Sequence, residues 1–233
     1  MKQVLCGVMV AAMCLMISSC GSAGNSNASD PGGTDGGGVQ TRLASSMAEY
    51  FDQVLNQAGK DSQVSESQLS ILSDARDHSE LTQSAYESAW ANYKQCMVDK
   101  GQPEPVLDKY SDGLYAQASI TGSDEKMDAF SDASSQCEAS EVTYVDQLYR
   151  VQEDNPELYA DTTEAIVDCL HRKNLVPDGY TAKDFTRESG TGDKSAFSFD
   201  PMSSESQSCF IANNYGYFDV TDMSAYRMQD LGW

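Results

Sequence analysis

The sequence has few basic residues and few histidines. Among its 233 residues there are 15 lysines and arginines against 36 aspartates and glutamates, a net charge of −21, and only two histidines. Such a negative field repels nucleic acid and anionic lipid headgroups, so we expect no nucleic-acid partner. No group of acidic residues has the spacing of a calcium-binding loop. We interpret the charge as a solvated surface, with a specific cation or a basic partner as the alternative.

The sequence also lacks the short motifs of several enzyme classes. The GxSxG, HExxH, P-loop, GxGxxG and SxxK patterns are all missing. His78 and His171 are expected near helix ends, as surface or capping residues, because an imidazolium suits the negative end of the helix dipole. A pair of carboxylates for glycoside hydrolysis stays open, because spacing in the chain does not give separation in space. We therefore predict no catalytic residue.

Strand signals are sparse, since no alternating run of β-branched residues exceeds a few positions. Helix signals are frequent. Thr82 is the expected N-cap of a helix, with Leu81 and Tyr86 as a hydrophobic staple, and Gly101 is its expected end. We predict a mainly α fold, with a single helical domain over residues 43–233.

Further helices are expected along the same domain. A weaker helix is predicted over residues 64–77. A long one is predicted from Met127 to Val151, interrupted near Ala139-Ser140 and broken by Asn155-Pro156. Capping residues predict three more, which start at Asp161, at Thr181 and at Asp200-Pro201 and end at Asn174, Gly190 and Asn213-Asn214. The tail after Tyr215 is expected to pack on the core, either as a small helix from Asp222 or as an added strand.

The first 20 residues, MKQVLCGVMVAAMCLMISSC, have the layout of a secretory signal. Lys2 precedes an apolar run over residues 4–17, which is too short to span a bilayer and is followed by polar sequence. A buried first helix would need a polar face, which this run lacks. The stretch Ile17-Ser18-Ser19-Cys20 resembles the lipobox of bacterial lipoproteins, in which a peptidase cuts before a cysteine that carries acyl chains. We predict a signal peptide over 1–19 and attachment to membrane lipid through two acyl chains, such as palmitate, on Cys20.

A flexible tether is predicted after the lipidated cysteine. Residues 21–42, GSAGNSNASDPGGTDGGGVQTR, are rich in Gly, Ser, Asn and Asp and contain almost no apolar residue. A chain of this composition and length has an r.m.s. reach of about 25 Å. The sequence thus divides into a signal over 1–19, a lipidated cysteine and tether over 20–42, and the helical domain over 43–233.

The cysteines of the domain follow a repeat. Cys96 and Cys137, and then Cys169 and Cys209, are separated by about 40 residues in each pair. Each first cysteine lies late in an expected helix, and a helix-ending residue follows five positions later. Each second cysteine lies inside an expected helix. We infer a duplication, with repeat-related helical units over about 80–150 and 155–214.

The repeat also predicts how the cysteines pair. Two cysteines leave with the signal and Cys20 takes lipid, so four remain, and an even number in an exported domain indicates disulfides. The repeat favours Cys96 with Cys137 and Cys169 with Cys209. The main alternative pairs Cys137 with Cys169. The helices on either side of Asn155-Pro156 could fold back on each other and so place these two cysteines side by side. Closing a loop of this size contributes about 4 kcal/mol in the chain-entropy model.

Other uses of the cysteines fit the sequence less well. A structural zinc site brings its ligands in close pairs, and only Cys169 and His171 are near each other. A catalytic thiolate at Cys96 would lie at the C-terminal end of its helix, where the dipole opposes negative charge. We predict no metal and no other cofactor.

Several aromatic residues offer a second kind of site. They could line a surface for a carbohydrate or a peptide, although packing in the core and at its rim is the favoured interpretation. These residues are Tyr110, Tyr115, Tyr215, Tyr217, Phe218 and Trp233.

The run LTQSAYESAWANYKQCMVDKG, together with the lipobox, the tether and the acidic composition, resembles the uncharacterised lipoproteins of high-GC Gram-positive (actinobacterial) bacteria. The shared pattern is a tyrosine and an acid, then an alanine, a tyrosine and a Cys-Met pair before a glycine. It is carried here by Tyr86, Glu87, Tyr93, Cys96, Met97 and Gly101. The resemblance covers a limited part of the chain. It implies anchoring at the cell membrane and an accessory role at the envelope, with a transporter as one candidate partner, and it brings no catalytic residues.

We therefore expect a non-enzymatic lipoprotein on the extracytoplasmic face that binds an envelope protein, a peptide or a glycan. The alternatives are a secreted hydrolase that uses carboxylates, and a structural spacer or surface antigen. A deep pocket with converging, desolvated carboxylates would favour the hydrolase. An exposed apolar patch would favour partner binding.

Overall fold

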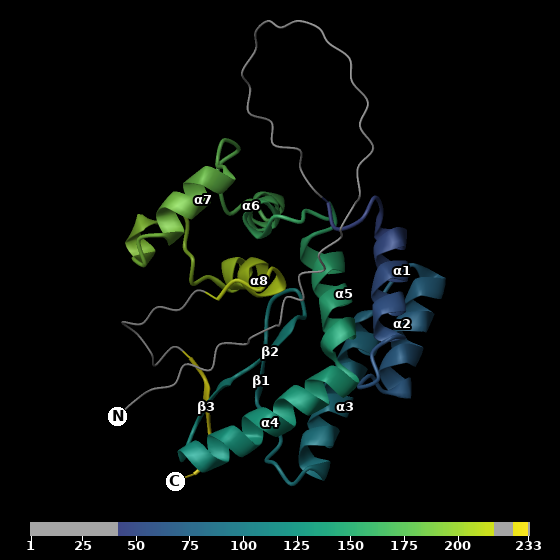
Figure 1. Cartoon of the computed structure of the whole chain (residues 1–233). Coiled ribbons are helices and arrows are strands. Elements are labelled where there is room, and N and C mark those ends of the chain that lie inside the picture. Colours follow the sequence, from purple (N-terminus) through teal and green to yellow (C-terminus); the bar gives the residue numbers. More distant parts are fainter. Residues whose placement is uncertain (1–41, 217–225, 233) are drawn as a thin grey trace, which may run out of the picture. The chain divides into compact units, whose positions relative to one another are not determined.

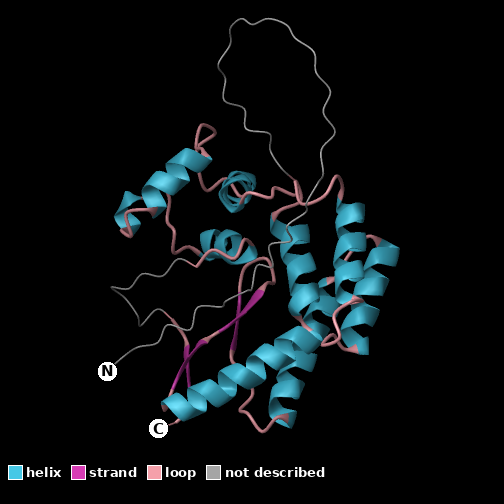
Figure 2. Ribbon diagram, viewed as in Figure 1, coloured by secondary structure: helices cyan, strands magenta, loops and turns pink. Residues whose placement is uncertain are grey.

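The computed structural model describes residues 42–216 and 226–232 (Figure 1). Contacts between residues group Gln40–Trp233 into one compact unit. The predicted signal peptide, Cys20 and the tether up to residue 41 lie outside the described residues. Within the described part most residues are helical and the strands are short (Figure 2), so the predicted mainly α fold is confirmed.

The described residues form two groups of helices and four short strands. The first group is α1 (Met47–Ala58), α2 (Glu66–His78), α3 (Gln83–Asp99), α4 (Asp124–Glu141) and α5 (Thr143–Asp154). The second is α6 (Thr162–Arg172), α7 (Ala182–Ser189), the 3-10 helix η1 (Lys194–Ala196) and α8 (Ser204–Ala212). The strands are β1 (Leu107–Lys109), β2 (Tyr115–Gln117), β3 (Ser119–Thr121) and β4 (Met228–Asp230).

The strands pair in two small sheets. β1 and β2 form an antiparallel hairpin in which Asp108 lies opposite Ala116. β3 and β4 are parallel, with Ile120 opposite Gln229. The tail therefore adds a strand, which is one of the two predicted alternatives. The other, a helix from Asp222, starts outside the described residues.

Helix α3 begins and ends where the sequence predicts. The Thr82 side chain accepts a hydrogen bond from the Ala85 N–H at 3.2 Å, which caps the first turn. Gly101 follows the helix with a φ of +78°, and the N–H of Gln102 donates to the carbonyl of Met97 at 3.0 Å. These bonds make a Schellman motif, in which the left-handed conformation favours glycine.

The long helix predicted from Met127 is two helices. The interruption falls at Val142, just after the predicted place, and it separates α4 from α5. Gln68 of α2 is fully buried beside this break. Its side chain donates to the carbonyls of Ala139 and Ser140 and accepts from the N–H of Tyr144, so the interrupted backbone keeps its partners.

Two helices differ from the sequence prediction. Helix α1 was not predicted, although Ser46 accepts from the Glu49 N–H and Phe51 and Val54 bury one face. Helix α8 begins at Ser204 with Ser203 as its N-cap, after the predicted start at Asp200-Pro201. The Ser203 side chain accepts a hydrogen bond from the Ser206 N–H, so the helix begins after this serine and not at the proline.

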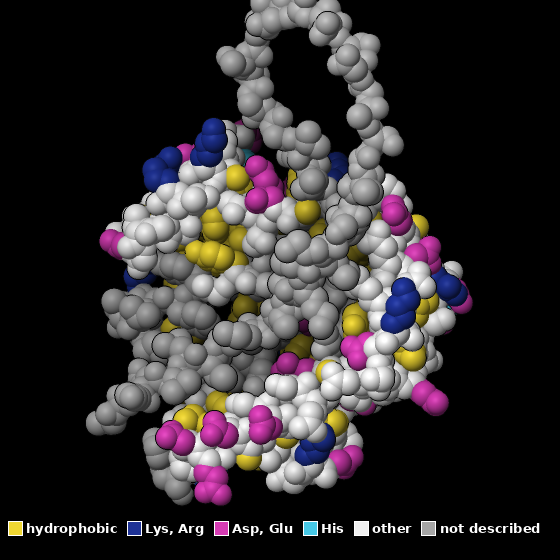
Figure 3. Space-filling model, in the orientation of Figure 1, with side chains coloured by type: hydrophobic (Ala, Val, Ile, Leu, Met, Phe, Trp, Pro, Cys, Tyr) yellow, Lys and Arg dark blue, Asp and Glu magenta, His cyan; other side chains and the backbone are white. Residues whose placement is uncertain are grey.

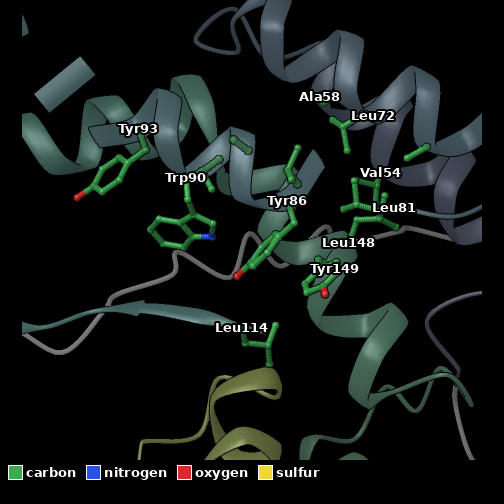
Figure 4. Packing of buried hydrophobic residues seen from close by; sticks show 14 of the residues in the cluster. Val54, Ala58, Leu72, Leu81, Tyr86, Trp90, Tyr93, Leu114, Leu148 and Tyr149 are labelled. Atoms are coloured by element: carbon green, nitrogen blue, oxygen red, sulfur yellow. The ribbon is translucent and has the colours of Figure 1, made fainter. Parts of the chain in front are cut away.

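Buried apolar side chains form two separate cores. The first core lies among α1 to α5 and includes the stacked rings of Tyr86 and Tyr149, whose centroids are 4.0 Å apart (Figure 4). The second core lies among α6, α7 and α8 and centres on Phe185 and Phe210. Helix α5 lies between them, with α1 and α2 on one side and α6 and α8 on the other (Figure 1).

Candidate functional site

The disulfides have the predicted pairing. Cys96 of α3 is bonded to Cys137 of α4, and Cys169 of α6 is bonded to Cys209 of α8, with a Cα–Cα distance of 5.7 Å in both. The rival pairing of Cys137 with Cys169 is therefore wrong. Cys96 is partly exposed, whereas the other three cysteines are fully buried.

The surroundings of the two disulfides repeat as well. Five residues after Cys96 comes Gly101, and five residues after Cys169 comes Asn174, which has a φ of +57°. The N–H of Leu175 donates to the carbonyl of Leu170 at 2.9 Å, so α6 ends in the same motif as α3. The two helical units thus share one way of ending a helix beside a disulfide.

A cluster of four polar residues lies where the two groups of helices meet, and we call it the polar junction. Asp112 comes from the turn of the β1–β2 hairpin and Asp154 is the last residue of α5. Lys173 is the C-cap of α6, and Ser208 lies on α8. Asp154 and Ser208 are at most 1% exposed. Four segments that are distant in the sequence thus bring two carboxyls, an ammonium and a hydroxyl together.

The contacts within the polar junction centre on the two carboxyls. The Lys173 ammonium pairs with Asp112 and lies 3.4 Å from Oδ1 of Asp154. The Ser208 hydroxyl donates to Asp112. Lys173 thus brings the two carboxyls together, and a hydrogen bond between them requires a proton on one of them. Oδ2 of Asp154 is buried and has no hydrogen-bond partner among the described residues.

The two carboxyls have different proton affinities. Burial, followed by the hydrogen bond with Asp112, raises the pKa of Asp154 to about 7. Burial also opposes ionisation of Asp112, but hydrogen bonds from Asp154, Lys173 and Ser208 outweigh it and hold the pKa of Asp112 below its usual value. The pair therefore keeps one proton up to about neutral pH, with Asp112 ionised and Asp154 protonated.

The two carboxyls of the polar junction lack the separation of a glycosidase site. Glycosidases hold their two carboxyls apart to leave space for the sugar or a water, whereas Asp112 and Asp154 lie close enough to share the Lys173 ammonium. Sγ of Cys169 lies 3.2 Å from Oδ1 of Asp154. A disulfide sulfur carries no hydrogen, so only the protonated carboxyl can donate in this contact. The geometry of the pair therefore does not support glycoside hydrolysis.

The same place does not fit a metal ion. Asp154, Cys169 and Cys209 put three ligand-type atoms within 4.8 Å of one another. Both sulfurs are bonded to each other, and metal binding requires free thiolates. The Lys173 ammonium beside Asp154 adds a repelling positive charge.

Both histidines lie at helix ends, as predicted. His78 is the last residue of α2, where a hydrogen bond with the backbone of Asp74 and the charge of that residue raise the pKa of the exposed ring. His171 lies in the last turn of α6, and its Nε2 is 2.8 Å from the carbonyl oxygen of Tyr180. Neither contact indicates catalysis.

Three of the six aromatic residues considered for a binding surface pack against the cores, which was the favoured interpretation. Tyr110 and Tyr115 lie against the first core and Tyr215 lies against the second. The other three, Tyr217, Phe218 and Trp233, lie outside the described residues. Within the first core, the indole N–H of Trp90 lacks a hydrogen-bond partner among the described residues, but the indole meets the Tyr86 ring edge-on, with their centroids 6.3 Å apart (Figure 4).

A shallow depression of about 400 Å³ lies between α6 and α7 on the surface of the described residues. It is lined by Asp161, Thr163, Glu164, Ala182, Lys183, Thr186 and Arg187. The lining mixes both signs of charge and suits a polar or charged group of a partner. Elsewhere acidic side chains are spread over the visible face, with several along α4 (Figure 3).

Sequence reasoning did not single out the residues of the polar junction. Asp154 carried a signal, because it follows Leu148 and Val151 at helical spacing and so continues the inward face of α5. A carboxyl on the buried face of a helix needs a hydrogen-bond or ion-pair partner. Nothing local identified Asp112 or Lys173 as that partner.

No family model, curated protein or solved structure matches this chain. Among the helices of the described residues, none combines the length and the apolar character that crossing a membrane requires.

Proposed function

We propose that this chain is a lipoprotein of the extracytoplasmic face of the cell membrane, where it binds a partner without catalysing a reaction. Cys20 carries the acyl chains, residues 21–42 form the tether, and the helical domain makes the contacts with the partner. The observation that carries the proposal is the stretch Ile17-Ser18-Ser19-Cys20 directly after the apolar run over 4–17. The resemblance to actinobacterial lipoproteins points the same way.

The disulfides support this location. All four cysteines after Cys20 are paired, and structural disulfides form and persist in oxidising compartments such as the space outside the cytoplasmic membrane. Two acyl chains hold a protein stably at a membrane, so the domain needs no apolar surface of its own for anchoring.

Partner binding is supported by the character of the surface. The depression between α6 and α7 is shallow and is lined by side chains of both charge signs, and it suits a contact with a peptide, a glycan or an envelope protein. Asp154 of the carboxyl pair is buried, and the pair lacks the carboxyl separation of a glycosidase, so it does not favour a glycoside hydrolase. A transporter or another envelope protein is the partner class that the resemblance favours.

Cell fractionation tests the anchoring. The chain is expressed in an actinobacterial host as wild type, Cys20→Ala and Cys14→Ala, the last being a matched control inside the signal. We expect acyl chains on wild type and Cys14→Ala from the membrane fraction, and none on Cys20→Ala, because only Cys20 accepts lipid. A Cys20→Ala chain that carries acyl chains would refute the proposal.

Crosslinking in the native membrane tests the binding role. Tagged wild type is compared with Lys183→Glu/Arg187→Glu, which reverses the basic side of the depression, and with Lys60→Glu as a control in the exposed turn after α1. We expect one envelope partner with wild type and with the control, and a loss of that partner with the double variant. Failure of wild type to capture any reproducible partner would contradict the binding role.

A further inference from the structure

The two cores meet through polar contacts. Every buried member of the second core lies between Ile166 and Phe210, and Ala212 is the buried residue that α8 adds to the first core. Polar contacts also cross the boundary: Arg150 of α5 donates to the carbonyl of Ile211, and Arg172 of α6 donates to the carbonyl of Asp154 at 2.6 Å. The polar junction lies at the same boundary.

Neither disulfide crosses this boundary. We call the helices α1 to α5 with β1 to β3 the N-terminal unit and the helices α6 to α8 the C-terminal unit. Cys96–Cys137 closes within the first and Cys169–Cys209 within the second. Residues 155–161 connect α5 to α6. A change in the docking of the C-terminal unit therefore breaks no covalent bond.

The charges of the polar junction balance while the carboxyl pair holds a proton. Asp112 is then negative, Lys173 is positive and Asp154 is neutral. Loss of the proton adds a second negative charge next to a single ammonium, and leaves Oδ2 of Asp154 buried without a donor. An uncompensated buried charge strongly favours any state that exposes it to water.

The other groups that face Asp154 do not compensate this charge. Arg172 of α6 reaches only its backbone carbonyl and pairs with Asp168 at 2.9 Å. From α5 itself come Tyr149, whose phenol stays protonated because burial raises its pKa, and Glu153, which is acidic. Helix α8 contributes the neutral hydroxyl of Ser208. Lys173 is therefore the cation that faces the carboxyls.

We propose that the polar junction is a pH-operated latch: it holds the C-terminal unit against the N-terminal unit while Asp112 and Asp154 share a proton, and it weakens when that proton leaves. The latch depends on the fold alone and not on anchoring, so its test and the test of the proposed function can fail separately.

The sign of the pH effect follows from proton linkage. The pKa of Asp154 is raised from 3.8 to about 7, so between these values the closed state binds one proton more than a state with the carboxyl in water. The equilibrium constant for opening then rises about tenfold per pH unit across this window and levels off above it. Arg150 stays charged throughout, so its bond to Ile211 persists and opening remains a minor state.

Hydrogen exchange read by mass spectrometry tests the latch on the full chain with both disulfides intact. Protection factors, corrected for intrinsic exchange, are compared at about pH 5 and about pH 7.5. For wild type we expect protection of α6 to α8 to fall by about 100-fold, while α1 to α3 change less than about threefold. An equal fall in both units, or no fall, would overturn the proposal.

Two variants assign the effect to the carboxyl. Asp154→Asn keeps the shape but cannot ionise, and we expect its C-terminal unit to keep its protection at the higher pH. Asp52→Asn, on the exposed face of α1, is the matched control and should behave as wild type. An Asp154→Asn chain with the wild-type loss would overturn the proposal. If it does not fold, carbon NMR of wild type replaces it: an aspartate carboxyl titrating near pH 7 is expected, and none titrating above about pH 5 would exclude the latch.

Discussion

At the residue scale, Gln68 holds together the place where α4 and α5 part. Its amide donates to the carbonyls of Ala139 at 3.1 Å and Ser140 at 2.6 Å, and accepts from the N–H of Tyr144 at 2.7 Å. These groups lie at a break in the helical ladder and away from water. The amide therefore replaces hydrogen bonds that a continuous helix would have made.

We predict that Gln68→Ala lowers the free energy of unfolding by about 2–4 kcal/mol, because it leaves several buried backbone groups without partners. Urea denaturation followed by circular dichroism measures the effect. Gln57→Ala, at an exposed position of α1, is the control and should change stability by less than about 0.5 kcal/mol. Equal effects of the two substitutions would show that the contacts of Gln68 do not stabilise the break.

Asp112 and Asp154 show where prediction from the sequence ends at this scale. The stripe that runs through Leu148 and Val151 predicts that Asp154 faces inward. Its partners come from a hairpin turn and from the end of another helix, and their meeting depends on how the two units dock. For this reason the sequence left carboxylate pairs open, and only the folded chain brings this one together.

At the element scale, the helix ends were the most predictable feature, because caps are local. Gly101, Asn174 and Asn214 each follow a helix in the left-handed conformation, with φ of +78°, +57° and +54°. Glycine and asparagine adopt this conformation more easily than other residues. Strands β1 to β3 were not predictable, because each spans only three residues and shows no alternation.

We predict that Gly101→Ala destabilises the protein by about 1 kcal/mol. The space around a Cβ at this position is empty, so the cost comes from the left-handed backbone alone. Gly179→Ala is the matched control, since its Cβ also meets nothing and its φ lies outside that region. Thermal unfolding of both variants measures the difference. If Gly101→Ala is as stable as Gly179→Ala, the left-handed backbone at the end of α3 does not disfavour a side chain, and the prediction is wrong.

At the scale of the whole molecule, two disulfide-closed units share one domain and keep separate cores. The pairing of the cysteines was predictable, because the repeat of spacing and of helix-ending residues relates Cys96 to Cys169 and Cys137 to Cys209. The polar contact between the units was not, because no repeat or motif marks it. Helix α1 lies outside the repeat, and its short apolar face was overlooked although Ser46 and Glu49 signalled its start.

The proposed attachment of this domain to a membrane depends on Cys20, and mass spectrometry of the N-terminal tryptic peptide tests it most directly. Trypsin cuts after Arg42 and leaves residues 20–42 as one peptide if the signal has been removed. For protein extracted from the membranes of a lipoprotein-processing bacterial host, the account predicts a peptide that begins at Cys20 and carries a diacylglyceryl group. A peptide that begins at Gln3 and so still contains the predicted signal, or one with a free thiol at Cys20, would contradict it.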